Sequence, residues 1–421
     1  MAPKEHVKIS ILTLGCKVNQ AESSSIEGAL KSCGHQVVDM SEKPDVCIVN
    51  TCTVTAKSDC QSRQLIRRAH RAGARVLVTG CYSELNKESV QSMQGVEEII
   101  NNANKLSIIN KLSDKTTDVS SALSGASKSR FFLKIQDGCD YSCSYCTIPK
   151  ARGASKSVSP DTVVRQAAEA VSAGFNEIVL TGIHLGAYGL DLKHKVTLSE
   201  LVETILKQTT ISRLRISSIE VREIDDRLLD LLTDRRICNH LHIPLQSGND
   251  RILQLMNRTY NSEQFSFKIT QISKKIQGIS IGTDVIVGFP GEGDAEFQST
   301  YSLLEGLAIS YMHVFPFSSR PGTDAAEMTD NTPPEVKNSR VQSLSLLNAR
   351  KKAIYMLEQV GNTHDVLIED INIAGASLGT SGNYLKVIIP INKHPRGSLI
   401  PVRIKGIQEG RLIGSPILQH N

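Results

Sequence analysis

Apolar runs of strand length alternate with amphipathic helical patterns along most of the chain, and this alternation restricts the fold more than any other feature. Between the runs of the first region, the segments "QAESSSIEGALKSCG" and "AKSDCQSRQLIRRAHRAG" have the helical period and close on glycine. Because parallel strands need crossover connections, residues 1–112 are predicted to form an α/β domain, a parallel sheet between layers of helices. Its predicted strands are "VKISILTLGC", "PDVCIVNTC" and "ARVLVTGC".

A second region of the same kind follows a stretch dominated by Ser and Thr, "SDKTTDVSSALSGASKSR" (113–130), which is typical of a linker. Six strand-like runs separated by helical patterns indicate a partial (βα)6 barrel over residues 131–360, with its site on the loops after the strands. A long helical pattern (333–361) ends this region. The six runs are "RFFLKIQDGC", "NEIVLTG", "RLRISSIE", "NHLHIPLQSG", "ISIGTDVIVGFPG" and "SYMHVFPFS".

The last region, residues 361–421, changes character. Its runs "HDVLIEDI", "YLKVIIPI" and "LIPVRIKGI" are short, β-type and separated by Gly, Ser, Asn and Pro. This pattern predicts a small β-barrel. From residue 371 onward there are six Lys or Arg and one acidic residue, which suits a polyanion such as RNA. A second basic run, residues 63–75 with five arginines, fits either an RNA contact or a solvated helix face.

The cellular compartment in which the protein resides affects how its ten cysteines are interpreted. The charged start "MAPKEHVKIS" lacks the apolar run of a signal peptide, and no stretch is apolar enough for a membrane span. We therefore expect a cytoplasmic protein that makes no use of a membrane. In reducing cytoplasm, clustered cysteines more often bind metal than form disulfides.

Cys139, Cys143 and Cys146 form a CxxxCxxC loop directly after a predicted strand. Three thiolates at this spacing can hold three corners of a four-iron cluster and leave one iron open to another ligand. A zinc site completed by a distant ligand, such as Cys238 or a histidine, is the alternative, but no second CxxC exists.

Cys16, Cys52 and Cys81 each end one of the three predicted strands of the first region. Parallel strands end on the same side of their sheet, so these cysteines could converge on one further centre. Single buried cysteines are also common in cores, so accidental placement is the alternative. Cys60 is the candidate substitute if one of the three is misassigned.

The motif CxxxCxYC, with Tyr145 before the last cysteine, resembles the signature of radical S-adenosylmethionine enzymes. "TLGCKVNQAES", "NTCTVT", "HIPLQSGND", "DVIVGFPGE", "FPFSSRPGT" and "GSLIPVRIKG" extend the resemblance to the methylthiotransferase family over essentially the whole chain. The resemblance implies S-adenosylmethionine and two [4Fe–4S] clusters. One cluster is implied on Cys139, Cys143 and Cys146, and the other on Cys16, Cys52 and Cys81.

Further roles follow from the same resemblance. It implies that Tyr145 packs near the cofactor's adenine and that Gly182, in "LTGIHLG", lies near its methionyl part, although turn or core packing explains either residue equally well. It implies a TRAM-like, RNA-binding role for the C-terminal barrel. An electron donor and a sulfur source are also implied.

The activity implied is radical replacement of an unactivated C–H bond by a C–S bond, which acid–base side chains cannot perform. No Ser–His–Asp set is evident in the sequence. Three histidines near strand ends either transfer protons or make structural hydrogen bonds, namely His184, His240 and His242. "GCKVNQ" with "NTCTVT" resembles the branch that converts N6-threonylcarbamoyladenosine, in the tRNA anticodon loop, to its 2-methylthio form. Isopentenyladenosine in tRNA and an aspartate of a ribosomal protein are the alternative substrates. A non-catalytic iron–sulfur or zinc protein that binds RNA is the alternative class.

Overall fold

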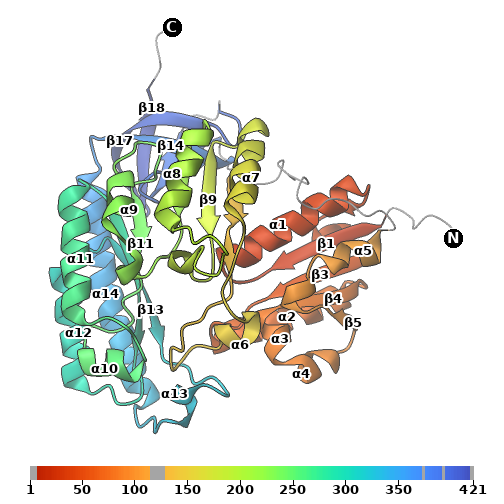
Figure 1. Cartoon of the computed structure of the whole chain (residues 1–421), viewed down its shortest axis with the longest axis horizontal. Helices are drawn as coiled ribbons and strands as arrows, with labels where there is room; N and C mark the ends of the chain where they lie inside the picture. The colour runs from red at the N-terminus through yellow and green to blue at the C-terminus, as the bar shows by residue number, and fades with distance from the viewer. Residues whose placement is uncertain (1–6, 114–128, 372–374, 391–393, 418–421) are drawn as a thin grey trace.

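The computed structural model describes residues 7–113, 129–371, 375–390 and 394–417. Three regions containing sheets follow one another along the chain, and the N-terminal one lies beside the central barrel (Figure 1). Most of the predicted linker (113–130) lies outside the described residues.

The N-terminal sheet contains the three predicted strands in its centre. β1 (Lys8–Thr13), β3 (Val46–Thr51) and β4 (Arg75–Gly80) are flanked by two short edge strands, β2 (Gln36–Val37) and β5 (Val96–Ile99). The order is β2-β1-β3-β4-β5 and every pairing is parallel. The predicted parallel sheet is therefore confirmed.

Helices cover both faces of this sheet. α1 (Lys17–Ser32) and α5 (Ser107–Leu112) bury Ile26 and Ile108 with the strand residues of one face. α2 (Ala56–Arg71) and α4 (Lys87–Gln91) pack against the other face. Because both faces are covered, the central strand β3 is buried along its whole length, which explains its continuous apolar run.

The central region contains all six predicted strands in sequential order. They form two parallel three-stranded sheets, β10-β9-β6 and β11-β12-β13, which are joined by a parallel bridge between Leu214 and Ile237. The result is an open barrel, as predicted. The strands are β6 (Phe131–Lys134), β9 (Glu177–Thr181), β10 (Arg213–Ile216), β11 (His240–His242), β12 (Ser280–Val287) and β13 (Tyr311–Pro316).

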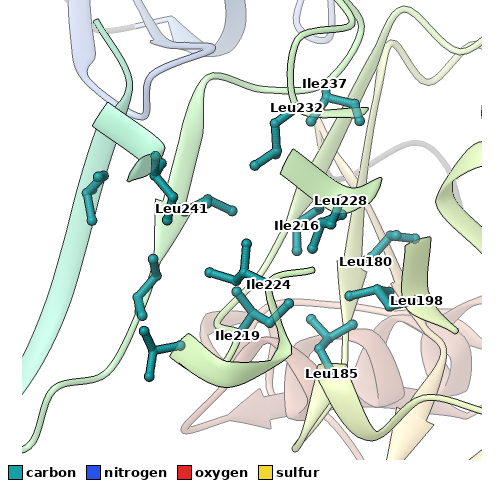
Figure 2. Packing of buried hydrophobic residues seen from close by; sticks show 14 of the residues in the cluster. Leu180, Leu185, Leu198, Ile216, Ile219, Ile224, Leu228, Leu232, Ile237 and Leu241 are labelled. Atoms are coloured by element: carbon teal, nitrogen blue, oxygen red, sulfur yellow. The ribbon is translucent and has the colours of Figure 1, made fainter. Parts of the chain in front are cut away.

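Helices line the outside of the barrel (Figure 1). Figure 2 shows how Leu180, Ile216 and Leu241 of the strands meet Leu198 and Leu228 of the helices in one continuous core. The helices of this region are α6 (Ile148–Arg152), α7 (Pro160–Ser172), α8 (Leu198–Gln208), α9 (Asp226–Leu231), α10 (Asp250–Leu255), α11 (Ser262–Lys275), α12 (Asp294–Gly306), α13 (Asp324–Glu327) and α14 (Pro334–Glu358). A short antiparallel pair, β7 (Gln136–Asp137) and β8 (Lys156–Ser157), flanks the cysteine loop.

The C-terminal region is a closed barrel of five strands in the order β14-β15-β16-β18-β17. Tyr355 and Met356, at the end of α14, contribute to its core. The predicted small β-barrel is confirmed, although β15 and β18 were not foreseen. Its strands are β14 (Thr363–Ile371), β15 (Ser377–Ser381), β16 (Lys386–Ile389), β17 (Leu399–Gln408) and β18 (Arg411–Pro416).

The exact domain boundaries stay predictions, although α5 ends at Leu112, β6 begins at Phe131 and β14 begins at Thr363. Across the described part of the chain, no helix combines the length and the apolar character needed to cross a membrane.

Candidate functional site

The N-terminal cysteines lie where the three central strands of the first sheet end. β3 ends at Thr51 and β4 at Gly80, so Cys52 and Cys81 follow them directly, while Cys16 is the N-cap residue of α1, three residues after the end of β1. Gly15 has a φ of +99°, and a Cβ added there would lie 2.8 Å from the Sγ of Cys52. The loop before Cys16 therefore needs glycine in order to lie against Cys52.

Gly80 brings the third cysteine to the same place. Its φ is +104°, and an added Cβ would lie 2.3 Å from the backbone oxygen of Thr51. Cys52 and Cys81 are buried, and Cys16 is exposed. Burial raises the pKa of the Cys52 thiol, and the neighbouring thiols of Cys81 and Cys16 raise it further. The three thiols thus form one group with one exposed member.

The remaining N-terminal cysteines stand apart from this group. Cys60 is exposed on α2, where the Nε2 of Gln64 lies 3.8 Å from its Sγ. Cys33 and Cys47 are buried in apolar clusters. Burial raises the pKa of Cys47 to about 12, so this thiol is protonated at neutral pH.

Cys139, Cys143 and Cys146 lie on the loop between β7 and α6. The N–H of Cys139 donates to the carbonyl of Gly153 (3.1 Å), and the N–H of Cys146 donates to the carbonyl of Cys143 (3.0 Å). Burial, together with the thiols of Cys143 and Cys139, raises the pKa of Cys146 to about 12. The loop therefore holds its three thiols close together in a low-dielectric setting, where thiolates need compensating positive charge.

Two side chains supply hydrogen-bond donors to this loop. The Nη1 of Arg258 lies 3.2 Å from the Sγ of Cys143, and the Nδ1 of His184 lies 3.6 Å from the Sγ of Cys139. Burial lowers the pKa of His184, but its hydrogen bonds to Cys139 and Glu223 outweigh burial and raise the pKa to about 10. A positive charge at His184 and at Arg258 stabilises the adjacent thiolates.

Cys238 does not complete the central loop. It is buried beside Arg215 and Glu177, and Glu177 begins β9, whereas His184, the neighbour of Cys139, follows the end of β9. The length of a strand thus separates Cys238 from Cys139, which removes it as the fourth ligand of a zinc site.

Arg152 connects the two cysteine groups across the domain interface. Its Nε donates to the Sγ of Cys81 (3.2 Å), and its Nη1 donates to Asp137 (2.8 Å), two residues before Cys139. The guanidinium is fully buried and also pairs with Glu22 of α1 (3.0 Å). A single buried cation therefore reaches both the Cys81 thiol and the base of the central cysteine loop.

A second contact joins the same two regions. Arg320, in the "FPFSSRPGT" motif after β13, donates to the carbonyl of Thr53 (2.9 Å) and pairs with Asp59 (2.8 Å). The loop after Cys52 is thus bound to the rim of the central barrel. Sequence reasoning missed the roles of Arg152, Arg258 and Arg320, because the residues that they contact at the two cysteine groups lie 71 to 267 residues away along the chain. These residues are Cys81, Cys143 and Thr53.

The two residues predicted to touch the cofactor lie beside the central loop. Tyr145 packs against the apolar cluster that contains Met256 and Phe289. Gly182 follows β9, and a Cβ added there would lie 2.9 Å from the Oε1 of Gln136, which accepts the N–H of His184. Both placements serve packing, and the cofactor roles of Tyr145 and Gly182 stay predictions.

His240 and His242 lie inside the barrel. The phenol of Tyr311 makes hydrogen bonds with the Nε2 of His240 (2.8 Å) and with the Nδ1 of His242 (3.2 Å). Burial lowers the pKa of His240 well below its usual value, and nearby cations lower it further, so its ring is neutral. Both histidines have the structural hydrogen bonds that the sequence analysis considered.

Comparisons with known proteins place these features in a family. The family model of the radical SAM superfamily matches residues 133–304, and that of "Uncharacterized protein family UPF0004" matches residues 8–101. The solved structure of the radical S-adenosylmethionine methyltransferase TsrM from Kitasatospora setae, with cobalamin and a [4Fe–4S] cluster bound, matches with a TM-score of 0.56 at 14% identity over 76% of each chain. At that identity the match concerns the fold.

Curated relatives are similar over nearly the full length. "Threonylcarbamoyladenosine tRNA methylthiotransferase MtaB" of Bacillus subtilis (strain 168) is 35% identical over 94% of this chain and 93% of its own. "tRNA-2-methylthio-N(6)-dimethylallyladenosine synthase" of Pelotomaculum thermopropionicum is 30% identical over 98% of each chain. The chain belongs to the methylthiotransferase family of radical S-adenosylmethionine enzymes. The predicted enzyme class is confirmed, and the non-catalytic alternative is set aside.

Membership of the superfamily brings S-adenosylmethionine and a [4Fe–4S] cluster as cofactors. The loop of Cys139, Cys143 and Cys146 lies within the matched residues, and its spacing and hydrogen-bond donors suit such a cluster.

Proposed function

We propose that this enzyme converts N6-threonylcarbamoyladenosine next to the anticodon of tRNA to its 2-methylthio derivative. The observation that carries the proposal is the buried Arg152, which lies between Cys81 of one three-cysteine group and Asp137, two residues before the first cysteine of the other. Two such groups would supply two metal centres to one substrate, as the transfer of sulfur to an unactivated carbon requires.

In this proposal Cys139, Cys143 and Cys146 hold the cluster that binds S-adenosylmethionine. When bound, these cofactors supply the radical chemistry that removes hydrogen from the C2 position of the base, for which no side chain suffices. Arg258 and His184 donate hydrogen bonds toward Cys143 and Cys139, which stabilises the thiolate form of the ligands and raises the reduction potential of the centre. Tyr145 and Gly182 are the proposed contacts of the cofactor.

Cys16, Cys52 and Cys81 are proposed to hold a second [4Fe–4S] cluster, the one that presents sulfur. Arg152 donates to the Sγ of Cys81 and offsets the negative charge of the ligands in a buried setting. The exposed Cys16 leaves one side of this group accessible. The sulfur itself comes from an external source and the electrons from an external donor.

The choice of substrate follows the relatives. Those named for threonylcarbamoyladenosine are 33–35% identical to this chain, and those named for dimethylallyladenosine are 30–31% identical. A base beside the anticodon lies in a loop and is therefore available without the opening of a duplex. The C-terminal barrel, which exposes Arg403, Lys405 and Arg411, is the proposed TRAM-like contact for the tRNA backbone.

Nucleoside mass spectrometry tests this function. tRNA from cells that lack the gene should have lost 2-methylthio-N6-threonylcarbamoyladenosine and accumulated the precursor without the methylthio group. The wild-type gene should restore the modification, and a Cys143→Ala gene should not. Loss of the methylthiolated isopentenyladenosine instead would assign the alternative substrate.

A further inference from the structure

Polar side chains from distant parts of the sequence meet inside the central barrel. The Nζ of Lys17 lies 5.6 Å from the centre of the Tyr384 ring, which itself lies 4.6 Å from the ring of His240. The phenol of Tyr311 makes a hydrogen bond with His240, and the centre of the Tyr311 ring lies 5.5 Å from the centre of the His313 ring. We call Lys17, Tyr384, Tyr311, His313 and Asp284 the inner wall.

Lys17 places this wall beside the proposed sulfur-presenting centre. It is the residue after Cys16 and the first residue of α1, a helix that packs against β6 of the central barrel. Lys17 and Tyr384 are half-buried and His313 is exposed, so the wall is accessible to a solute. A base held near Cys16 would therefore have its substituents within reach of Lys17.

The cations near the wall outnumber the carboxylates. Glu177 pairs with Arg213 and Arg215 and lies 3.9 Å from Arg130, while Glu369 pairs with Arg130 and Lys386. With Asp284 of the wall itself there are thus three carboxylates, against the four cations Arg130, Arg213, Arg215 and Lys386 and the further cation Lys17. Within the described ranges, the ammonium of Lys17 makes no ion pair with any carboxylate.

The excess of positive charge also affects the pKa of the Tyr384 phenol. Burial raises its pKa, but Lys17, Arg130 and Arg215 outweigh burial and lower the pKa below its usual value. Burial also lowers the pKa of Lys17 itself, and Arg215 and Arg130 lower it further. A partly dehydrated ammonium that has no carboxylate partner among the described residues is stabilised in its charged form by a bound anion.

A divalent cation is the other ligand that the residues of the inner wall could bind, but the charges around the wall disfavour it. The ligand atoms of His242, Asp284 and His313 lie within 4.8 Å of one another. However, the Nε2 of His242 is already 3.0 Å from Asp284, which uses the one carboxylate of the trio. Lys17 lies near enough to influence His313, and its positive charge would repel a dication.

We propose that Lys17 determines substrate specificity by pairing with the carboxylate of the threonyl group on the base. This inference rests on the proposed function and deepens it. N6-Threonylcarbamoyladenosine carries one carboxylate at the end of its N6 substituent, whereas an isopentenyl group is an uncharged hydrocarbon. A lysine without a carboxylate partner can pair with the threonyl carboxylate. An isopentenyl group would remove water from the Lys17 ammonium without replacing it by an anion, which would weaken binding.

Two synthetic RNAs and the reconstituted enzyme test the proposal. Both RNAs are the same anticodon stem–loop, one with the free threonyl carboxylate and one with its methyl ester, a neutral near-isostere. The wild type should bind the acid about 10- to 100-fold more tightly than the ester, as a charge-assisted hydrogen bond would give. Lys17→Met should bind the two RNAs equally, and Lys17→Arg should retain part of the preference.

The matched control is Lys57→Met, which removes the same charge from an exposed position at the start of α2. Any general loss of RNA affinity affects both RNAs, so the ratio of the two dissociation constants should stay at the wild-type value. Iron content and circular dichroism show whether each variant is folded.

Three results would overturn the inference, and they separate it from the proposed function. If Lys17→Met keeps the wild-type ratio, another group reads the carboxylate. If the wild type methylthiolates both RNAs and binds them equally, the proposed function stands and the carboxylate is not read. If the wild type acts on an isopentenyladenosine stem–loop and on neither of these RNAs, the proposed substrate fails, and the role of Lys17 fails with it.

Discussion

Replacement of Gly80 by alanine is the sharpest local test of the N-terminal centre. Gly80 is the last residue of β4, directly before Cys81, and has a φ of +104°. A Cβ at this position would lie 2.3 Å from the oxygen and 2.4 Å from the nitrogen of Thr51, which is backbone and not the end of a flexible side chain. Thr51 directly precedes Cys52, so any movement that relieves the contact shifts Cys52 relative to Cys81.

The free-energy cost of Gly80→Ala has two parts. The backbone conformation of Gly80 (φ +104°, ψ −179°) is one that essentially only glycine adopts, and it disfavours an L-residue by about 1–3 kcal/mol. The 2.3 Å distance between the added Cβ and the oxygen of Thr51 is about 1 Å shorter than an ordinary contact, and overpacking of this kind adds about 1–3 kcal/mol. Gly73, which lies between α2 and β4, is a matched control, because its φ is +84° and an added Cβ would meet nothing within 4 Å. Gly73→Ala therefore incurs only the first part.

The assay is iron analysis of anaerobically reconstituted protein, together with formation of 5′-deoxyadenosine. Gly80→Ala should lose about four irons, those of the N-terminal cluster, and should still cleave S-adenosylmethionine at the central loop. Gly73→Ala should keep the full iron content. If Gly80→Ala retains every iron and methylthiolates tRNA at the wild-type rate, the convergence of Cys52 and Cys81 at this edge is wrong.

Three further predictions concern the interfaces. Arg152→Met should destabilise the protein by about 1–3 kcal/mol, because Glu22 and Asp137 lose one buried partner but keep Lys105 and Lys134. Thermal unfolding measures the loss, and Arg165→Ala, which breaks an exposed ion pair, should leave the stability unchanged. Glu177→Gln should lower the free energy of unfolding by a similar amount at neutral pH. Burial raises the pKa of Glu177, but Arg215 and Arg213 outweigh it and lower the pKa to about 2, so the difference from wild type should be full above about pH 4.5 and shrink as the pH falls toward 2. A pH-independent difference would contradict this pairing. Arg67→Glu with Arg71→Glu, both exposed on α2, should reduce the slope of log affinity for tRNA against log salt by about 1.5, whereas a merely solvated helix face would leave the slope unchanged.

The sequence predicted what depends on local pattern. The apolar runs of β1, β3 and β4 are continuous because both faces of the sheet are covered, and so they were visible without a structure. The cysteines at their ends followed from the direction of parallel strands alone. The six barrel strands were found for the same reason. The edge strands β2, of two residues, and β5, with two glutamates, carry no such signal.

The side chains that connect the regions were beyond local pattern. Arg152 is the last residue of the short helix α6, and only the fold brings it to Cys81, 71 residues away. Tyr384 occupies a left-handed backbone conformation (φ 68°) at the tip of the loop between β15 and β16, and β15 itself was not predicted. Its contact with Lys17 joins positions more than 360 residues apart. Contacts of this kind require the tertiary structure.

The central claim is that two groups of three cysteines each hold a four-iron cluster. Iron and acid-labile sulfide should be measured in anaerobically purified wild type and in two variants in which all three cysteines of one group are alanine. The account predicts about eight irons per wild-type chain and about four in each variant. About four irons in the wild type, or bound zinc in place of iron, would contradict it.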